Sequence, residues 1–373
     1  MGFLKLAGKG FFIFLNLLVI LFLFLGCYGC YFNSGDSWIL GFFCLATFYI
    51  FLITIGFLIA WLLINPKWSL MSIMAIIICW MPLRHVYKIG WASSFVYEKS
   101  PEAIRVMSWN VEQFNMNPHK KTATKKQEMI DLINEFNPDI ACFQEMVGSD
   151  VNRTAKNYIP DFERNLKMKG SYFSYSKILD YDGKQSFGII TFSKYPIINK
   201  QTVYGDMKNY NTIFQYVDIV ANGDTFRVFN IHLQSLRFSS NNRSYIDDPS
   251  ISGGNDINQS KSILRKFRRG FILRHEQCDN VRKTMDESPY PIIVCGDFND
   301  VPNSYAYHTI GKNLKNAFVE KGIGLGTTFS DISPTLRIDN IFTDKNCTIT
   351  QFKRVKKMLS DHFPIITDFS YKK

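Results

Sequence analysis

Acidic residues are nearly absent from the first hundred positions of this 373-residue chain. Asp36 and Glu98 are the two that occur there, against six lysines and arginines. No charged residue interrupts the run from Trp38 to Ile64. Charged side chains are the ones that proteins keep in contact with water most strictly. Their depletion therefore indicates that this part of the chain lies in a membrane.

Cysteine is also sparse, with eight residues spread over the whole chain. Cys27, Cys30, Cys44 and Cys79 lie in the apolar part, and the other four are scattered over the remainder. This distribution argues against a disulfide framework and against a zinc site, and it predicts free thiols. Internal repeats at the periods typical of solenoid proteins are absent too, which argues against that architecture.

Three apolar runs fill the uncharged part, at residues 11–32, 38–64 and 68–83, with short polar turns between them. The first two exceed the roughly 20 residues that span a bilayer, and the third is marginal at that length. A cleaved signal peptide is the alternative for the first run, but its length and the runs that follow argue against it. The sequence predicts a multi-pass integral membrane protein, with three transmembrane helices over residues 1–88.

The orientation in the membrane depends on lysines and arginines near the spans, and they are almost evenly divided between the two sides. The first helix usually dominates, and the basic tail with Lys5 and Lys9 favours a cytoplasmic N-terminus. Three spans would then place the rest of the chain on the extracytoplasmic side.

Residues 89–103 have the composition of a linker, and residues 104–373 alternate between strand-like and helix-like segments. Period-2 and period-3.6 patterns are the evidence for these segments. The predicted helices cover residues 121–136 and 261–285, with a polar, mobile loop at 239–260. Predicted strands include residues 187–192, 211–220, 225–232 and 338–342. This mixture predicts an α/β domain in which helices cover two packed sheets.

Polar side chains follow several of the short apolar strands at the point where each strand ends. Asn110 ends one such segment, Glu145 a second, and Asp297 and Asn299 follow a third. His362 lies just before another apolar run. Acids, amides and a histidine at the ends of separate strands predict one polar pocket at the edge of a sheet.

In chain order, these segments read Trp109-Asn110, Gln144-Glu145, Gly296-Asp297-Phe298-Asn299 and Ser360-Asp361-His362. The ordered set resembles the endonuclease/exonuclease/phosphatase superfamily, which includes deoxyribonuclease I, apurinic endonucleases, neutral sphingomyelinases and inositol polyphosphate 5-phosphatases. The resemblance runs from about Ile104 to the C-terminus. It implies a four-layer α/β sandwich and a metal-dependent hydrolase that acts on phosphoester bonds.

The resemblance also implies a cofactor, Mg²⁺ or Mn²⁺ in its place. Mg²⁺ prefers oxygen ligands and retains several waters, so a few carboxylates suffice to hold it. Glu145 is the implied first ligand, with Asn110 beside it. Asp361 is a candidate for a second contact to the metal.

The remaining roles concern the attacking water and the leaving group. Asp297 is expected to orient or deprotonate the water, and Asn299 to hold a phosphate oxygen. His362 needs a carboxylate that stabilises its cation, and Asp339 matches the family position for that partner. His232 matches the second histidine of the nuclease and sphingomyelinase branches, and would protonate the leaving group or bind phosphate. Asp180 and Asp182 are both candidates for the acid that partners His232.

Together these features predict a membrane-anchored phosphoesterase that hydrolyses a phosphodiester in nucleic acid or in a phospholipid head group. A phosphomonoesterase acting on inositol phosphates is one alternative. Another is a non-catalytic, membrane-anchored binding module with the same fold. That module would be expected to have lost part of the acidic constellation, which is complete here. No protein partner can be inferred.

The predicted helix over 261–285 is strongly basic, and the chain as a whole has a formal net charge of +11. Arg265, Lys266, Arg268 and Arg269 are candidate substrate-binding residues, since they would lead an anionic substrate or lipid surface toward the metal. The alternative is an ordinary solvated helix.

Overall fold

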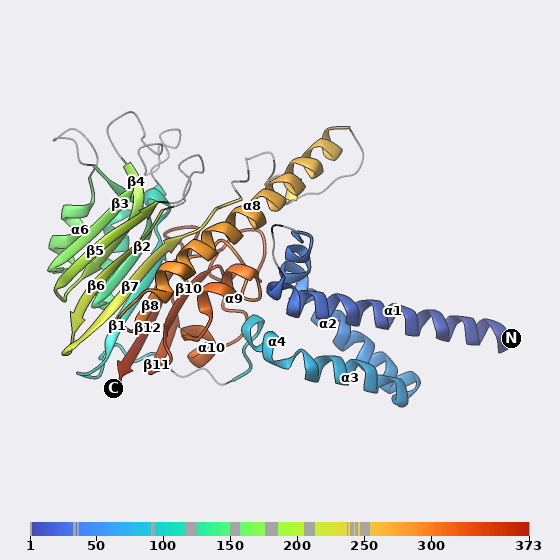
Figure 1. Ribbon diagram of the computed structural model, residues 1–373. Helices are drawn as coiled ribbons and strands as arrows, with labels where there is room; N and C mark the ends of the chain where they lie inside the picture. Colours follow the sequence, from blue (N-terminus) through green and yellow to red (C-terminus); the bar gives the residue numbers. More distant parts are fainter. Residues whose placement is uncertain are drawn as a thin grey trace.

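The computed structural model describes residues 2–32, 35, 37–90, 94–115, 125–149, 157–175, 186–204, 213–236, 238, 242, 245–246 and 254–372. It consists of a bundle of apolar N-terminal helices and two stacked sheets covered by further helices (Figure 1). Asp180 and Asp182 lie outside the described residues, as do residues 121–124 of the predicted first helix and most of the predicted loop at 239–260.

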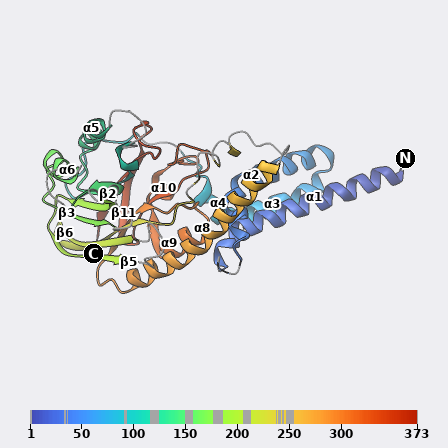
Figure 2. The ribbon, with the colours of Figure 1, turned by 90° about the horizontal axis from the view of Figure 1, so that it is seen from above.

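The apolar helices are α1 (Gly2–Tyr28), α2 (Leu40–Ile64), α3 (Ser69–Ile78) and α4 (Trp80–Val86). Two candidate spans, Ala7–Tyr31 and Leu40–Ile64, are long and apolar enough to cross a membrane. The bundle projects away from the sheets, and the N-terminal end of α1 lies farthest from them (Figure 2). Two or three long apolar helices of this kind indicate membrane anchoring.

The third apolar run differs from the single helix predicted over residues 68–83. Its two helical parts, Pro66–Ile78 and Trp80–Val86, are bent by 66° relative to each other. Pro82 explains the break, because its ring would clash with the carbonyl of residue 78, four positions earlier, and it has no N–H to donate there. Helix α3 accordingly ends at Ile78.

Each sheet has six strands. The first has the order β11-β12-β1-β2-β4-β3, formed by Cys347–Arg354, Ile365–Tyr371, Ile104–Asn110, Ile140–Gly148, Ser186–Ser193 and Gly170–Tyr175. The second has the order β5-β6-β7-β8-β10-β9, formed by Ile197–Tyr204, Ile213–Ala221, Asp224–His232, Ile292–Asp297, Asp339–Asp344 and Leu314–Asn316. Both sheets are mixed, and β1–β2 and β7–β8 are parallel pairs.

Three apolar cores hold the layers together. The central core joins the inner faces of the sheets, with Val106 and Cys142 from the first and Val228 and Ile293 from the second. A second core covers the outer face of the first sheet with α5 (Lys126–Phe136) and α6 (Ile159–Asn165). The third covers the outer face of the second sheet with α8 (Gly254–Asp286) and α9 (Tyr305–Gly311). This confirms the predicted four-layer α/β sandwich.

Helix α8 begins at Gly254, so residues 254–260 are helical and not part of a loop as predicted. Its middle packs on the first turn of α2, where the Phe42 and Phe271 rings lie 5.5 Å apart in an edge-to-face arrangement. The polar first part has tertiary contacts of its own, since Gln259 Oε1 accepts from Asn242 Nδ2 at 2.9 Å, and such contacts routinely override a weak helix propensity. A short α10 (Ala317–Lys321) completes the described helices of the sandwich.

The apolar helices contact the sandwich through loops that adjoin β8 and β10. Asn303, which follows β8, donates through Nδ2 to the Gly26 carbonyl and to Thr47 Oγ1. Arg337, which precedes β10, is buried and donates to the His85 carbonyl. The apolar bundle is therefore seated beside the ends of these two strands.

Candidate active site

Strand register gathers the predicted site residues at one end of the sandwich. In the second sheet, His232 and Asp339 are both paired with Asp297, from the neighbouring strands β7 and β10. In the first sheet, Asn110 at the end of β1 is paired with Gln144 of β2. The parallel pairs β1–β2 and β7–β8 end at the same edge. The antiparallel strand β10 begins at that edge with Asp339, so residues far apart in sequence converge here.

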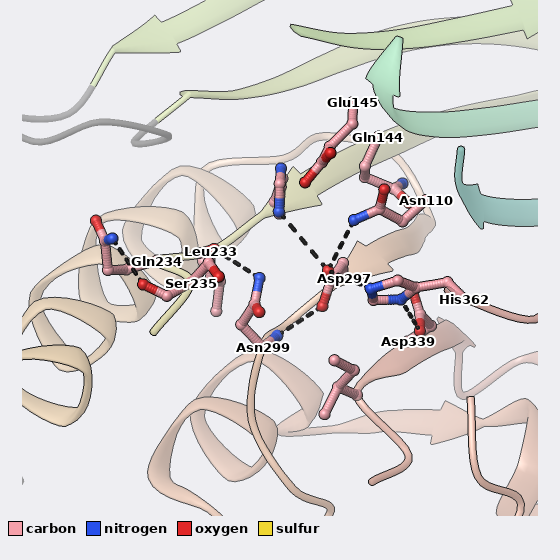
Figure 3. Close-up of polar contacts among 12 residues, drawn as sticks. Asn110, Gln144, Glu145, Leu233, Gln234, Ser235, Asp297, Asn299, Asp339 and His362 are labelled. Atoms are coloured by element: carbon pink, nitrogen blue, oxygen red, sulfur yellow. Dashed lines mark hydrogen bonds and ion pairs between the residues drawn. The ribbon is translucent and has the colours of Figure 1, made fainter. Parts of the chain in front are cut away.

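Asp297 lies at the centre of the site (Figure 3). Gly296 before it has φ of +153°, and a Cβ there would come within 2.0 Å of the Ile231 carbonyl oxygen. Only glycine therefore fits this approach to β7. The Asp297 carboxylate accepts from Asn110 Nδ2 at 3.1 Å and from the Asn299 backbone N–H at 2.8 Å. Burial raises the pKa of Asp297, although nearby histidines oppose this shift.

Two buried histidines face Asp297. His232 Nε2 lies 3.6 Å from Asp297 Oδ2, and His362 Nε2 lies 3.7 Å from the same oxygen. The other ring nitrogen of His362, Nδ1, lies 2.8 Å from Asp339 Oδ2. Burial opposes protonation of His362, but Asp339 and Asp297 outweigh it and hold the pKa of His362 well above its ordinary value. His362 is thus poised to carry a positive charge between two carboxylates.

Glu145 lies in β2 where the pairing with β4 shifts register, and it has a left-handed φ of 56°. Such a bulge turns a side chain out of the regular pleat. The half-buried carboxylate accepts from Gln113 Nε2 at 3.2 Å. Burial raises the pKa of Glu145 to about 7, and the charge of Asp361 adds to the shift.

Asp361 and Asn299 lie at the margins of the site. Asp361 Oδ1 is 3.9 Å from His362 Nε2, and the Asp361 backbone N–H donates to Glu112 Oε2 at 3.1 Å. Asn299 is half-buried and left-handed, and its Nδ2 donates to the Leu233 carbonyl at 3.0 Å. The amide of Asn299 is thereby fixed, with the neighbouring Asp297 on one side and the chain that follows His232 on the other (Figure 3).

Sequence reasoning missed Glu112 and Gln113, which follow β1 in a left-handed turn and contact Asp361 and Glu145. The one feature of the sequence that indicates a role for them is that they closely follow Asn110 along the chain. The turn itself has non-glycine residues at positive φ, which sequence patterns rarely predict.

The donor set fits a divalent cation. Asp297, Asp339 and His362 each offer a ligand atom, and these atoms lie within 4.8 Å of one another. Within the described part of the chain, buried Asp339 Oδ1 has no hydrogen-bond partner, which is unusual for a buried oxygen. The Glu145 carboxylate adds further oxygen donors nearby. Oxygen-rich sets of this kind suit Mg²⁺ better than soft metals.

The four basic residues predicted to bind substrate lie on the part of α8 nearest to α2 and residue 238. The Arg268 guanidinium lies 5.6 Å from the Trp38 ring centre, and Lys266 Nζ lies 6.0 Å from that of Phe238. Arg265 Nε donates to the Lys261 carbonyl at 3.3 Å. The contact of Arg268 places its charge at the junction with the apolar bundle. The role of all four residues, Arg269 included, in binding substrate stays a prediction.

Comparisons with known proteins agree with this architecture. The chain is similar to an endonuclease/exonuclease/phosphatase from Beutenbergia cavernae DSM 12333, with 17% identity, a TM-score of 0.52, and 72% of each chain covered. It is also similar to a family protein from Leptotrichia buccalis C-1013-b, with 16% identity and a TM-score of 0.51 over 72% of this chain and 100% of that one. The chain is also similar to the human Nocturnin catalytic domain with bound sulfate anion, with 18% identity and a TM-score of 0.51 over 73% of this chain and 94% of that one.

At these identities the solved structures establish the fold alone. A search of the curated proteins found no match. Residues 9–86 match the model of a domain of unknown function, DUF8431. Residues 107–362, well over half of the chain, match the model of the Endonuclease/Exonuclease/phosphatase family. The chain therefore belongs to this family, whose members are typically metal-dependent hydrolases of phosphoester bonds.

Proposed function

We propose that this protein is a membrane-anchored, Mg²⁺-dependent phosphoesterase that hydrolyses a phosphodiester. The observation that carries the proposal is the convergence of Asn110, His232 and His362 on the buried carboxylate of Asp297, within 3.1 to 3.7 Å. A carboxylate held between an amide donor and two histidines is suited to orient and deprotonate a water molecule. General acid–base catalysis by such a group typically contributes about 10²–10⁴-fold to the rate.

In this proposal Glu145, Asn110 and Asp361 hold the metal, Mg²⁺ or Mn²⁺. The set of Asp297, Asp339 and His362 is left to the acid–base chemistry, because a His362 cation has no lone pair to give a metal. When bound, the metal polarises the phosphoryl group and stabilises its developing charge. Glu145 must give up its proton to serve as a ligand, which its pKa of about 7 permits near neutral pH. Asn110 then links the metal site to Asp297, to which its Nδ2 donates.

The histidines complete the assignment. His362, kept cationic by Asp339, stabilises negative charge on the phosphoryl oxygens. His232 protonates the leaving oxygen or binds a phosphate oxygen, from a position 3.6 Å from Asp297. Asn299 supports a phosphate oxygen. The sulfate anion in the solved Nocturnin catalytic domain is consistent with an oxyanion site on this fold.

The chain is divided accordingly into an anchor, residues 1–88, a linker, residues 89–103, and a catalytic part, residues 104–373. The contacts of Asn303 and Arg337 with the apolar helices support a catalytic part that is held against its anchor. The location of the catalytic part outside the cytoplasm belongs to the proposal as well. An anionic substrate or an anionic membrane surface would be attracted by the basic residues of α8.

The test uses the full chain, purified in detergent, with bis(p-nitrophenyl) phosphate as a minimal diester. Hydrolysis should require Mg²⁺ or Mn²⁺ and stop with EDTA. Asp297→Asn should lower kcat by about 10²–10⁴-fold. Asp344→Asn is the matched control, because Asp344 lies at the far end of β10, where it accepts from the Asn346 backbone N–H.

Two outcomes would contradict the proposal. Equal activity of Asp297→Asn and the wild type would remove Asp297 from the chemistry. Faster hydrolysis of p-nitrophenyl phosphate than of the diester would favour a phosphomonoesterase. Binding of Mg²⁺ without turnover of either compound would favour the non-catalytic binding module.

A further inference from the structure

A cavity of about 430 Å³ lies between the apolar bundle and the sandwich, beside their direct contacts. Phe42, Leu45 and Ala46 of α2 line one side, and Phe267 and Phe271 of α8 line another. Its volume falls within the range of about 300–1,000 Å³ in which small-molecule sites occur. The cavity is thus large enough for a ligand, and its walls are mostly hydrocarbon.

The cavity reaches the proposed catalytic site. Asn299 lines it, and so does Asp300, the next residue in the loop after β8. Ile338, which directly precedes Asp339, lines it as well. Asn299 also donates its backbone N–H to Asp297 at 2.8 Å. A molecule that fills the cavity therefore ends within the reach of residues that surround the proposed phosphate position.

The charges at the cavity wall are already paired. Arg274 lines the cavity, but its buried guanidinium donates to Asp300 Oδ2 at 3.0 Å and to the Gln234 carbonyl at 3.0 Å. Ser333, on the wall formed by the loop before β10, bonds to the hydroxyl of Tyr49. With its polar groups satisfied in this way, the wall offers little to a nucleic-acid backbone, which needs free cationic and polar donors.

The position of α2 indicates where an apolar ligand would come from. Leu40–Ile64 is one of the two candidate membrane spans, and the cavity lies at its first turns. The basic stretch of α8 flanks the same place, with Arg268 over Trp38. A hydrocarbon pocket at a membrane helix, next to cationic side chains and a phosphoester site, matches an amphiphile with an anionic head.

We infer that the substrate is a membrane lipid with a phosphoester head group, whose hydrocarbon chain occupies the cavity between α2 and α8. The inference rests on the proposed function and narrows its substrate from phosphodiesters in general to lipids. The chain end lies against Phe42, Ala46 and Phe271, and the head group extends past Asn299 toward Asp297.

The experiment measures inhibition of bis(p-nitrophenyl) phosphate hydrolysis by ethyl, butyl, hexyl and octyl phosphate, with the full chain at a fixed detergent concentration. Burial of each methylene is expected to strengthen inhibition by about fourfold. Ala46→Phe narrows the cavity from the α2 side and should flatten this dependence on chain length. Ala60→Phe, the same substitution on the same helix away from the cavity, should retain the wild-type dependence and corrects for partition into detergent.

Leu336→Trp narrows the cavity from the sandwich side and replaces Ala46→Phe if that variant does not fold. The inference would be overturned if inhibition depended on alkyl chain length equally in the narrowed variants and in Ala60→Phe. The cavity would then be expected to hold a side chain or part of a protein partner. Failure of the proposed function has a different signature, because bis(p-nitrophenyl) phosphate would then not be hydrolysed by any variant.

Discussion

His362 owes its cationic form to two buried carboxylates. Asp339 Oδ2 is 2.8 Å from Nδ1, and Asp297 faces Nε2. Asp339→Asn removes the largest of the charges that raise the pKa of His362, so this pKa should fall. If the cation is the active form, activity is lost as pH rises through that pKa. The alkaline limb of kcat/KM should therefore move to lower pH in Asp339→Asn, while Asp344→Asn leaves it in place.

Glu145 provides a second prediction at the scale of one residue. Its pKa of about 7 means that protons compete with a metal below neutral pH. The apparent Kd for Mg²⁺, measured by isothermal titration calorimetry, should rise about tenfold from pH 8 to pH 6. Glu145→Gln should weaken binding and flatten this dependence. Glu128→Gln, on the exposed face of α5, should behave like the wild type. A pH-independent Kd in the wild type would place the metal elsewhere, for instance at Asp297 and Asp339.

The types of residue in the site were predictable, because strand-end acids and amides follow apolar runs and occur in the family order. The backbone conformation that orients these side chains was not predictable. Glu145 is turned by a bulge in β2, and Glu112 and Gln113 reach it through a left-handed turn. Bulges and positive φ values depend on pairing with distant strands, so a periodic sequence pattern does not indicate them.

At the scale of elements, a buried ion pair joins two central strands of the first sheet. Arg105 of β1 donates from Nε and Nη2 to both carboxylate oxygens of Asp368 in β12, at 2.7 and 2.8 Å. Arg105→Leu would leave a buried carboxylate without its cation, which typically costs about 3–5 kcal/mol. Chemical unfolding followed by circular dichroism should show this loss. Arg164→Leu, on the exposed end of α6, should change stability by less than about 0.5 kcal/mol.

The basic residues of α8 allow a test of electrostatic attraction. Replacing Arg265, Lys266, Arg268 and Arg269 by Gln should raise KM for an anionic lipid substrate and spare kcat. Each cation near an anionic surface contributes about 1 kcal/mol. The effect should shrink as salt rises, because screening already weakens the attraction. Unchanged kinetics at low salt would indicate that this stretch is an ordinary solvated helix.

Several strands and helices were predicted from their period, including the strand that ends at His232 and the helix that ends at Phe136. The short helices α6, α9 and α10 were not predicted. Asn137 in a left-handed conformation, followed by Pro138, stops that helix as the sequence indicates. The start of α8 at Gly254 was not predictable, because its first turns are polar and contain a pattern typical of loops. Its position against α2 depends on aromatic packing between segments more than 200 residues apart.

At the scale of the whole molecule, the anchor forms one wall of the cavity beside the proposed site. Asn303 and Gly26 are separated by 277 positions, yet they are hydrogen-bonded. Composition predicted the apolar helices and the family resemblance implied the hydrolase, but neither could predict that the two parts contact each other. The contact places α2 and Asn299 on the walls of one cavity, so under the proposed function the anchor would form part of the substrate site.

The path of the apolar helices decides on which side of the membrane the hydrolase lies. Helix α1 runs toward the sheets, α2 runs away from them, and α3 and α4 return (Figure 1). Three crossings would place the two ends of the chain on opposite sides. With Lys5 and Lys9 favouring a cytoplasmic N-terminus, a reporter fused after residue 373 should be extracytoplasmic.

Fusions of alkaline phosphatase and of a fluorescent protein test this arrangement, since the first is active outside the cytoplasm and the second inside it. A fusion after Lys67, in the turn between α2 and α3, is the control and should report the same side as the N-terminus. The C-terminal fusion should report the opposite side. Agreement between the two fusions would mean that the bent pair, with its 66° angle, re-enters the membrane without crossing it. That result would contradict the position of the hydrolase, since Asn303 contacts Gly26 at the end of α1 opposite the N-terminus.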